Sequence, residues 1–255
     1  EGIENCEETN GIYEAEDDDG TTYYYRGSVD NNWVSFAGYY WRIIRINGNG
    51  SIRMIYSGDS ESGPVETGEA TQIGTSAFNE QYSDNAYVGY MYGTPGSDTY
   101  EETHANINDS TIKTVLDTWY QTNLINYKDY LSTEAGFCGD RTPSTSSSSS
   151  NGQGGTGTTQ TYYGALRLIT NKTPTFECEN DSDLYTTSGS SRGNGALTYS
   201  IGLITADEVV YAGGVWNFAN TNYYLYNGPF PYYTISPSQY YGDAMGDVFY
   251  VNSGG

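Results

Sequence analysis

Positive charge is scarce in this sequence. Ten Lys and Arg residues face 32 Asp and Glu residues in a chain of 255, which gives a formal net charge of -22. Because no basic stripe is present to neutralise phosphates, the sequence argues against nucleic acid and anionic membrane surfaces as partners. Long apolar runs are missing as well, so we expect no direct insertion into a membrane.

Histidine and the familiar catalytic motifs are equally scarce. His104 is the only histidine, so a nucleophile triad would have to use it. It lies in the stretch YEETHANIND, which we read as a loop, and we therefore interpret His104 as a surface loop residue. No phosphate loop occurs, and the G-x-G-x-x-G spacing at 152–157 lies in a low-complexity run rather than between a strand and a helix. Among so many acids no pair of carboxylates stands out for glycoside hydrolysis. The sequence predicts a protein that is not an enzyme.

Cysteine occurs three times, as Cys6, Cys138 and Cys178, and without the C-x-x-C spacing of a zinc site. Cys138 and Cys178 flank a long stretch of mostly Ser, Thr and Gly. A disulfide closing this stretch would remove loop entropy worth about 3 to 4 kcal/mol, and we predict that bridge. Cys6 stays free, pairs between chains, or pairs with a cysteine outside this sequence.

The scarcity of lysine contrasts with an abundance of Tyr, Ser, Thr, Asn and Gly. This composition is typical of a secreted or surface-displayed protein. We expect residues 1–22, which are acidic and rich in turns, to form a surface lead-in, and residues 23–255 to form one domain. The low-complexity run at 141–161 is predicted to bury nothing and to be a mobile loop tied at its base by the disulfide.

Calcium is the only cofactor that the acids suggest. The run EAEDDDG resembles a D-x-D-G loop, but Ala15 stands where the first ligand should be. Asp17 and Asp19, with a nearby carbonyl, are weak calcium candidates. A solvated acidic turn is the alternative.

Two apolar segments on either side of INGNGS predict a β-hairpin, with strands at 39–46 and 51–56. Both strands are apolar on both faces, which places them at the centre of a sheet covered on both sides. Arg42, Arg45 and Arg53 lie in this hairpin, and we expect them to be structural and to pair with carboxylates from the loops.

Two helices are predicted. DSTIKTVLDTWYQTNL begins with Asp109 or Ser110 as a cap and has an apolar face, formed by Ile112, Val115, Leu116 and Trp119. LITADEVVYAGG predicts a short helix at 206–212, with a capping box of Thr205 and Glu208, a hydrophobic staple of Ile204 and Val209, and a stop at Gly213. Helices with hairpins indicate the α+β class.

The segment from 220 to 252 is crowded with tyrosine. Buried Tyr hydroxyls need partners, so some of these rings are expected to face solvent. Exposed Tyr mixed with Asn, Ser, Gly and Asp is typical of a recognition surface, whereas a tyrosine-rich fibre is the alternative. The predicted ligand-binding residues are Trp216, Asn222, Tyr223, Tyr224, Tyr226, Tyr232, Tyr233, Tyr240, Tyr241 and Asp243.

Several runs carry a resemblance to a known family, namely YYWRIIRINGNGSIRMIY, DNAYVGYMYGTPGS, ALTYSIGLITADEVVYAGG, YYLYNG, YYTISPS and VFYVNSGG. Through them the chain resembles uncharacterised surface proteins of gut Firmicutes. The C-terminal half of that family is similar to the C-type-lectin-like fold, including the variable proteins of diversity-generating retroelements. Some relatives carry a pilin-like leader.

The resemblance implies a C-type-lectin-like fold with a twisted antiparallel sheet, two helices and long irregular loops. It makes the helix after Thr205 the second lectin-fold helix and the loops that follow it the ligand-facing surface. W-N-F at 216–218 departs from the W-N-D calcium motif of sugar-binding lectins. No cysteine follows Cys178, whereas formylglycine-generating enzymes of this fold use a late cysteine pair.

We therefore expect a non-enzymatic, adhesin-like binding module, outside the bacterial cell or on its surface, that recognises a protein or glycan on another cell or surface. The alternative is a structural subunit of an extracellular filament. That alternative depends on Cys6, on the tyrosine-rich surface and on a sheet edge left open where relatives continue into a further strand, because an open edge can be filled by a neighbouring chain.

Overall fold

The computed structural model describes residues 10–61, 63–144, 154–242 and 246–255. Cys6, Asp243 and the middle of the serine-rich run lie outside these ranges. The described chain is an α+β fold of mostly antiparallel strands with few helices, so the predicted class is confirmed. No helix in the described ranges combines the length and apolar character that crossing a bilayer requires.

The N-terminal part forms a five-stranded antiparallel sheet with β4 at its centre. β5 pairs with one edge of β4, while β2 and β3 share the other edge. The predicted hairpin around INGNGS is thus confirmed as β4 and β5. The central position is confirmed for β4 but wrong for β5, which pairs only with β4 in the described chain. The strands are β1 (Gly11–Asp17), β2 (Gly20–Arg26), β3 (Trp33–Phe36), β4 (Tyr39–Ile46) and β5 (Ile52–Asp59).

β1 corrects the prediction of an acidic lead-in, because all seven of its residues pair with β2. Its side chains alternate, with Tyr13 and Asp17 toward the protein and Glu14 and Glu16 toward solvent. An alternation of period two, typical of a half-buried strand, is thus present within the acidic run.

The C-terminal part forms a three-stranded antiparallel sheet in the order β12-β11-β9. Pro237 has no N–H for the ladder, and the register of β11 against β12 shifts on both sides of it. The last strand of the chain, β12, lies at the edge of this sheet in the described residues. The remaining strands are β6 (Met91–Tyr92), β7 (Asn108–Asp109), β8 (Phe137–Cys138), β9 (Thr161–Tyr162), β10 (Leu184–Tyr185), β11 (Tyr232–Tyr240) and β12 (Gly246–Val251).

The two predicted helices are present. α2 (Thr111–Asn123) is capped by Ser110, whose side chain accepts from the Lys113 N–H, but Val115 is exposed and Tyr120 is buried in its place. α3 (Ala206–Ala212) has the predicted capping box and ends at Gly213, whose φ is +132°. The other helical segments are short: η1 (Glu69–Thr71), η2 (Asn85–Val88), α1 (Tyr100–Thr103), η3 (Ile125–Tyr130), η4 (Leu166–Asn171) and η5 (Asp181–Asp183).

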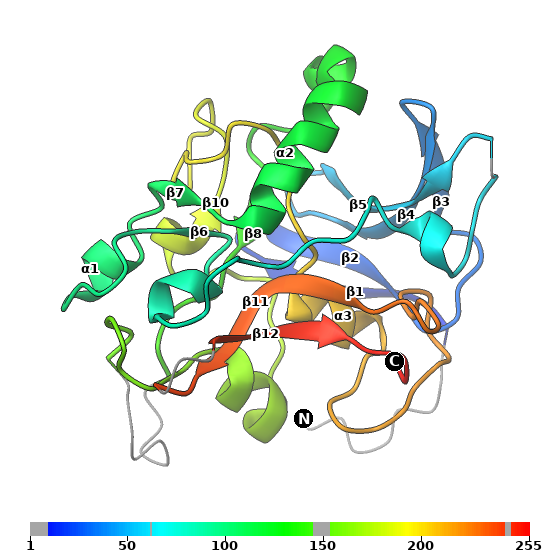
Figure 1. Cartoon of the computed structure of the whole chain (residues 1–255). Helices are drawn as coiled ribbons and strands as arrows, with labels where there is room; N and C mark the ends of the chain where they lie inside the picture. The colour runs from blue at the N-terminus through cyan, green and yellow to red at the C-terminus, as the bar shows by residue number, and fades with distance from the viewer. Residues whose placement is uncertain (1–9, 62, 145–153, 243–245) are drawn as a thin grey trace.

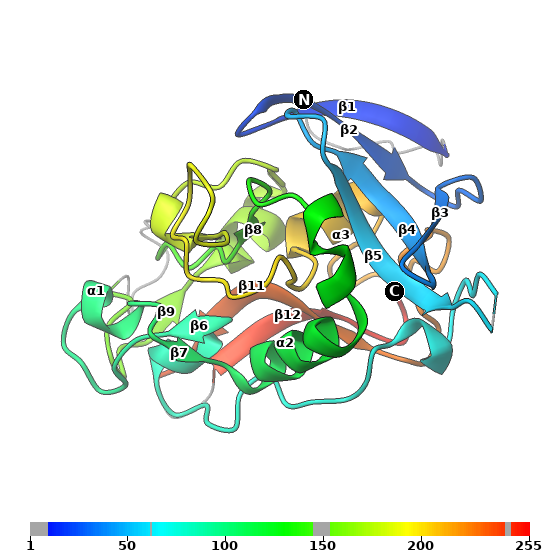
Figure 2. The ribbon, with the colours of Figure 1, turned by 90° about the horizontal axis from the view of Figure 1, so that it is seen from above.

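α3 lies between the two sheets and contacts β2 on one side and β11 and β12 on the other (Figure 2). The long helix α2 stands beside the five-stranded sheet (Figure 1). Its C-terminal half packs against Trp41 of β4, and its N-terminal half belongs to a second core cluster with Ile235 of β11. The core therefore joins N-terminal and C-terminal strands through these two helices.

The predicted disulfide is confirmed, with Cys138 bonded to Cys178. The prediction that the 141–161 run buries nothing is wrong at its ends. Arg141 is buried because it pairs with Asp183, and Thr161 is buried because it joins β11 opposite Tyr240. Partners distant in sequence thus order the two ends of a low-complexity stretch.

Candidate functional site

The C-terminal tyrosines do not form the exposed surface that the sequence predicts. Tyr223, Tyr224 and Tyr240 are 4%, 7% and 1% exposed, and Tyr226 and Tyr232 are half-buried. Tyr223 and Tyr224 pack with Ile44, Val209 and Val251, so their rings are part of the core. An exposed contact surface is therefore wrong for these three tyrosines, because burial of a large ring can outweigh the cost to its hydroxyl. Tyr224, Tyr226, Tyr232 and Tyr233 instead line a cavity described below.

The exposed members of the predicted set are scattered. Trp216, Asn222, Tyr233 and Tyr241 are exposed, and Trp216 contacts Phe249 edge to face. Tyr233 lies at the start of β11 and Tyr241 directly after its end, roughly 25 Å apart at the rise of an extended strand. These two tyrosines therefore do not make one contact surface, and Asp243 lies outside the described residues.

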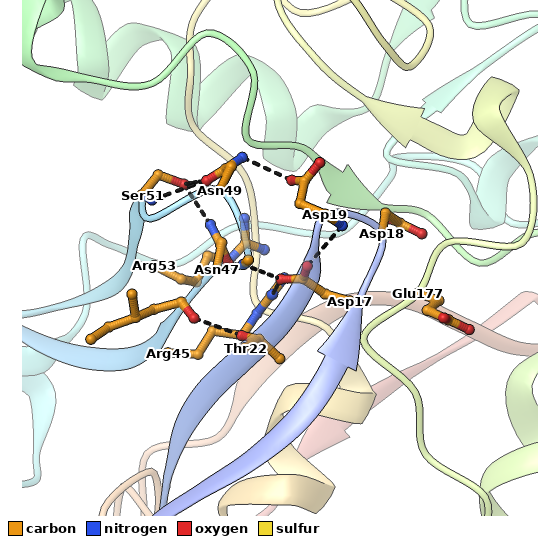
Figure 3. A network of polar contacts seen from close by, with 12 residues as sticks. Asp17, Asp18, Asp19, Thr22, Arg45, Asn47, Asn49, Ser51, Arg53 and Glu177 are labelled. Atoms are coloured by element: carbon orange, nitrogen blue, oxygen red, sulfur yellow. Dashed lines mark hydrogen bonds and ion pairs between the residues drawn. The ribbon is translucent and has the colours of Figure 1, made fainter.

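The acidic turn between β1 and β2 is the centre of a polar network (Figure 3). The Asp17 carboxylate accepts from Arg45 Nη1 at 2.7 Å, from the Gly48 N–H at 3.0 Å and from the Asp19 N–H at 2.9 Å. Asp19 accepts from Asn49 and pairs with Arg192. The turn is thus bound to the β4–β5 hairpin by charge-assisted hydrogen bonds.

This network replaces the predicted calcium site. Asp17 is buried with its oxygens directed at Arg45 and backbone N–H groups, while Asp19 faces Asn49 (Figure 3). Asp19 also forms an ion pair with Arg192. Within the described ranges no three His, Cys, Asp or Glu side chains are grouped to hold a metal ion. The calcium prediction at Asp17 and Asp19 is therefore wrong in its geometry, because arginines supply the positive charge.

The three arginines of the β4–β5 hairpin divide into two kinds. Arg45 pairs with Asp17 and Glu208, and Arg53 pairs with Glu208 at 3.0 Å. Burial alone would raise the pKa of Glu208, but the two guanidinium groups hold it below its usual value. The structural role predicted for Arg45 and Arg53 is confirmed, whereas Arg42 has no carboxylate at ion-pair distance among the described residues.

Asp140 lies in a small polar cleft beside the disulfide. Burial raises its pKa to about 7, although Arg167, 2.5 Å away, acts in the opposite direction. A carboxyl that titrates near neutrality is a candidate proton donor or acceptor. The cleft holds only about 50 Å³, which is room for a few water molecules rather than a substrate. Asp140 is therefore better explained as part of the ion-pair cluster with Arg167 and Asp207.

His104 is not the surface residue that the sequence predicts, because its side chain is 5% exposed. Its ring stacks on Tyr100 with centroids 4.2 Å apart, and Nδ1 lies 3.1 Å from the Tyr100 carbonyl oxygen. Burial, together with the nearby charge of Arg141, lowers its pKa to about 3. His104 is a neutral core residue over the physiological pH range.

A cavity of about 520 Å³ opens beside the five-stranded sheet and α2. Its wall is built by β4 and β5, by α2, and by the segments 71–76, 200–204 and 224–233. Most of the lining side chains are apolar or aromatic, as with Trp41, Met54, Leu116, Leu203 and Phe230. The size lies within the range of roughly 300 to 1,000 Å³ that is typical of small-molecule sites.

The cavity explains two exceptions to the predicted core. Val115 on α2 and Ile52 on β5 are exposed although apolar, and both line this opening. Gly202 allows the 200–204 segment to lie against the wall, since a Cβ there would come within 2.5 Å of the Phe137 ring. The cavity is our candidate functional site.

Comparisons with protein-family models, with curated proteins and with solved structures find no match. The likeness to the Firmicutes surface proteins and to the C-type-lectin-like fold therefore stays a prediction. What the site can do has to be argued from its own residues.

Sequence reasoning named four of the lining residues, Tyr224, Tyr226, Tyr232 and Tyr233, but missed the cavity itself, since its wall joins segments from many separate parts of the chain. One signal was available in Arg42, the hairpin arginine that follows Trp41 in the apolar strand. A cation in a strand that is apolar on both faces must be buried or reach an opening.

Proposed function

We propose that this chain is a non-enzymatic binding module, outside the bacterial cell or on its surface, that takes an apolar ligand group into the 520 Å³ cavity. The single observation that carries the proposal is the cavity itself, with its aromatic and aliphatic wall. Pockets of this size and character are the usual form of small-molecule sites. No catalytic group is part of the proposal.

The extracellular location is supported by the Cys138–Cys178 disulfide, because such bridges persist mainly in oxidising compartments. A C-type-lectin-like architecture is also part of the proposal. It is supported by the predicted α2 and α3 helices, by the antiparallel strands and by the long irregular connections.

The test is binding of N-phenyl-1-naphthylamine, an uncharged fluorescent probe, measured by its emission. Gly74 lines the cavity, and a Cβ built there meets no atom within 4 Å. Gly74→Trp should place a bulky ring at the opening and weaken probe binding about tenfold, the equivalent of about 1.4 kcal/mol. Gly189→Trp is the matched control, because Gly189 has the same open surroundings and does not line the cavity.

A probe that does not bind, or that binds both tryptophan variants as tightly as the original chain, would overturn this proposal. Circular dichroism of each variant shows whether the fold is kept. Tight binding by Gly189→Trp with weak binding by Gly74→Trp supports it.

A second candidate function is self-association as a filament subunit. It is favoured by a run of exposed apolar side chains after α3, Val215, Trp216 and Phe218, beside β12, which is the edge strand of its sheet in the described chain. Exposed apolar patches and open sheet edges are both typical of contact sites.

Electron microscopy distinguishes this second candidate. If the run after α3 makes subunit contacts, Trp216→Ser with Phe218→Ser should abolish filaments, and Tyr130→Ser, at an exposed ring elsewhere, should not. Discrete particles formed by the unaltered chain would count against a filament. The predicted adhesin role, toward a protein or glycan partner, would then depend on Trp216 and its exposed neighbours.

A further inference from the structure

Four cationic side chains in the described chain are buried: Arg42, Arg53, Lys113 and Arg141. Three of them have a carboxylate partner, namely Glu208 for Arg53, Asp109 and Asp117 for Lys113, and Asp183 for Arg141. Arg42, which is 4% exposed, has none among the described residues. Buried charges are normally paired because desolvation is costly, so Arg42 requires an explanation.

The contacts of Arg42 satisfy only part of its guanidinium group. Nη2 donates to the Val29 carbonyl oxygen at 2.5 Å. The group also lies over two rings, 4.2 Å from the centroid of Trp33 and 5.2 Å from that of Tyr224. Rings of this kind stabilise a cation without neutralising it. Nε is buried without a hydrogen-bond partner in the described chain.

Tyr224 adds a second unused donor at the same place. Its hydroxyl is buried and has no hydrogen-bond partner in the described residues, although its ring faces Arg42. Both Arg42 and Tyr224 line the cavity. An apolar cavity lined by two residues that each have a buried, unused donor, one of them charged, is complementary to an acceptor group attached to an apolar body.

The surrounding charges leave room for such a group. Burial lowers the pKa of Arg42, and Tyr224, Glu66 and Asp30 act in the opposite direction. Glu66 and Asp30 are exposed, and neither forms an ion pair with Arg42. Glu66 also lines the cavity, but neither it nor Asp30 occupies the donors of Arg42.

We propose that the cavity binds an organic anion, a carboxylate or sulfonate carried on an apolar body, whose charged group accepts from Arg42 Nε and the Tyr224 hydroxyl. The inference rests on the proposed function of the cavity and names its ligand class. Arg42 supplies the counter-charge and orients the ligand, while the aromatic wall holds the apolar body. The ligand in turn pairs a buried cation that the chain itself leaves without a carboxylate.

Two probes of similar shape test this ligand class. 8-Anilinonaphthalene-1-sulfonate is an anion, whereas N-phenyl-1-naphthylamine has the same fused and phenyl rings without the sulfonate. A chain of net charge -22 repels anions as a whole, so a general apolar site should favour the uncharged probe. We expect the reverse, with the sulfonate bound about tenfold more tightly because of its charge-assisted hydrogen bonds.

Arg42→Met removes the charge and keeps much of the side-chain length. It should weaken binding of the sulfonate about tenfold and leave binding of the uncharged probe unchanged. Tyr224→Phe should weaken binding of the sulfonate by a few-fold and should not weaken binding of the uncharged probe. Lys128→Met is the matched control, because it removes one exposed positive charge that does not line the cavity. Should Arg42→Met not fold, Tyr224→Phe and the comparison of the two probes on the unaltered chain decide the matter.

The outcomes separate the two proposals. If the uncharged probe binds at least as tightly as the sulfonate and neither variant changes the ratio, the anion site is overturned while the cavity stands. If neither probe binds, both proposals fail. If Lys128→Met weakens the sulfonate as much as Arg42→Met does, the effect is general charge and the Arg42 assignment is wrong.

Discussion

The surroundings of Arg141 and those of Arg42 handle a buried guanidinium group in opposite ways. Arg141 Nε donates to Asp183 at 2.7 Å, Nη1 donates to the Met91 carbonyl at 2.9 Å, and Nη2 donates to Asn106 at 2.8 Å. Every nitrogen of that group is engaged. Arg42 has one carbonyl, two ring faces and an unused Nε.

The difference separates a structural charge from a candidate binding charge. Around Arg141 the chain supplies carboxylate, carbonyl and amide acceptors, so removing the arginine leaves a buried Asp183 without its counter-ion. Removing Arg42 would leave no acidic side chain of the described residues without an ion-pair partner. A buried cation that neutralises no carboxylate of the fold, and that borders a cavity, is better suited to a ligand.

The largest expected effect comes from removing each arginine in turn. Arg141→Met should lower the free energy of unfolding by about 3 to 5 kcal/mol, since it strands a buried carboxylate. Arg42→Met should change it by about 1 kcal/mol or less, since no buried anion is left behind. Urea unfolding followed by circular dichroism measures both values. Equal losses would remove the distinction between the two arginines.

His104 provides a smaller effect within the Arg141 surroundings. Its folded pKa of about 3 lies below its ordinary value of 6.5, so the unfolded chain takes up a proton first as the pH falls. The stability tied to neutral His104 is therefore present above pH 6.5 and is lost progressively toward pH 3. Between pH 7 and pH 4.5 the unaltered chain should lose about 2 to 3 kcal/mol more than His104→Asn does.

Urea unfolding at the two pH values measures this difference. Other groups, including Asp140 with its raised pKa, are present in both proteins, so their contributions cancel in the comparison. Equal losses in the two proteins would show that His104 accepts a proton readily in the folded state, against the burial and the Arg141 charge that surround it.

The smallest expected effect compares two tyrosines at the cavity. The Tyr232 hydroxyl donates to the Leu225 carbonyl at 2.7 Å, so Tyr232→Phe should lower the free energy of unfolding by about 1 kcal/mol. The Tyr224 hydroxyl has no partner in the described chain, so Tyr224→Phe should be neutral or slightly stabilising. Thermal unfolding of the two variants measures the difference, and a larger loss for Tyr224→Phe would indicate that its hydroxyl is already engaged.

Much of the local structure was predictable because its causes lie within a few residues. Thr205, Glu208 and Gly213 set both ends of α3, Ser110 begins α2, and the INGNGS turn joins β4 to β5. A cap or a turn depends on adjacent backbone groups. The Cys138–Cys178 bridge was predictable because few cysteines were available to choose from.

The candidate site was not predictable in the same way. Tyr223, Tyr224 and Tyr240 have the composition of a contact surface, yet β4, α3 and β12 bury the first two and β9 pairs with the third. The sequence shows which rings are present, but it does not show which distant segments pack over them. Arg141 and His104 were misread for the same reason, since the partner of Arg141 is Asp183, in another loop.

The sequence by itself determined the α+β class, the helices α2 and α3 and the β4–β5 hairpin, because capping, turn and alternation rules act on neighbouring residues. It also determined the disulfide, because few cysteines were available. Only the tertiary structure decided which groups Arg42, Arg45 and Arg53 contact. All three share one hairpin, yet Arg45 and Arg53 reach Glu208 on α3 and Arg42 reaches the cavity wall. Ion pairs and cavities depend on which distant segments meet, and burial then sets the cost of a charge left without a partner.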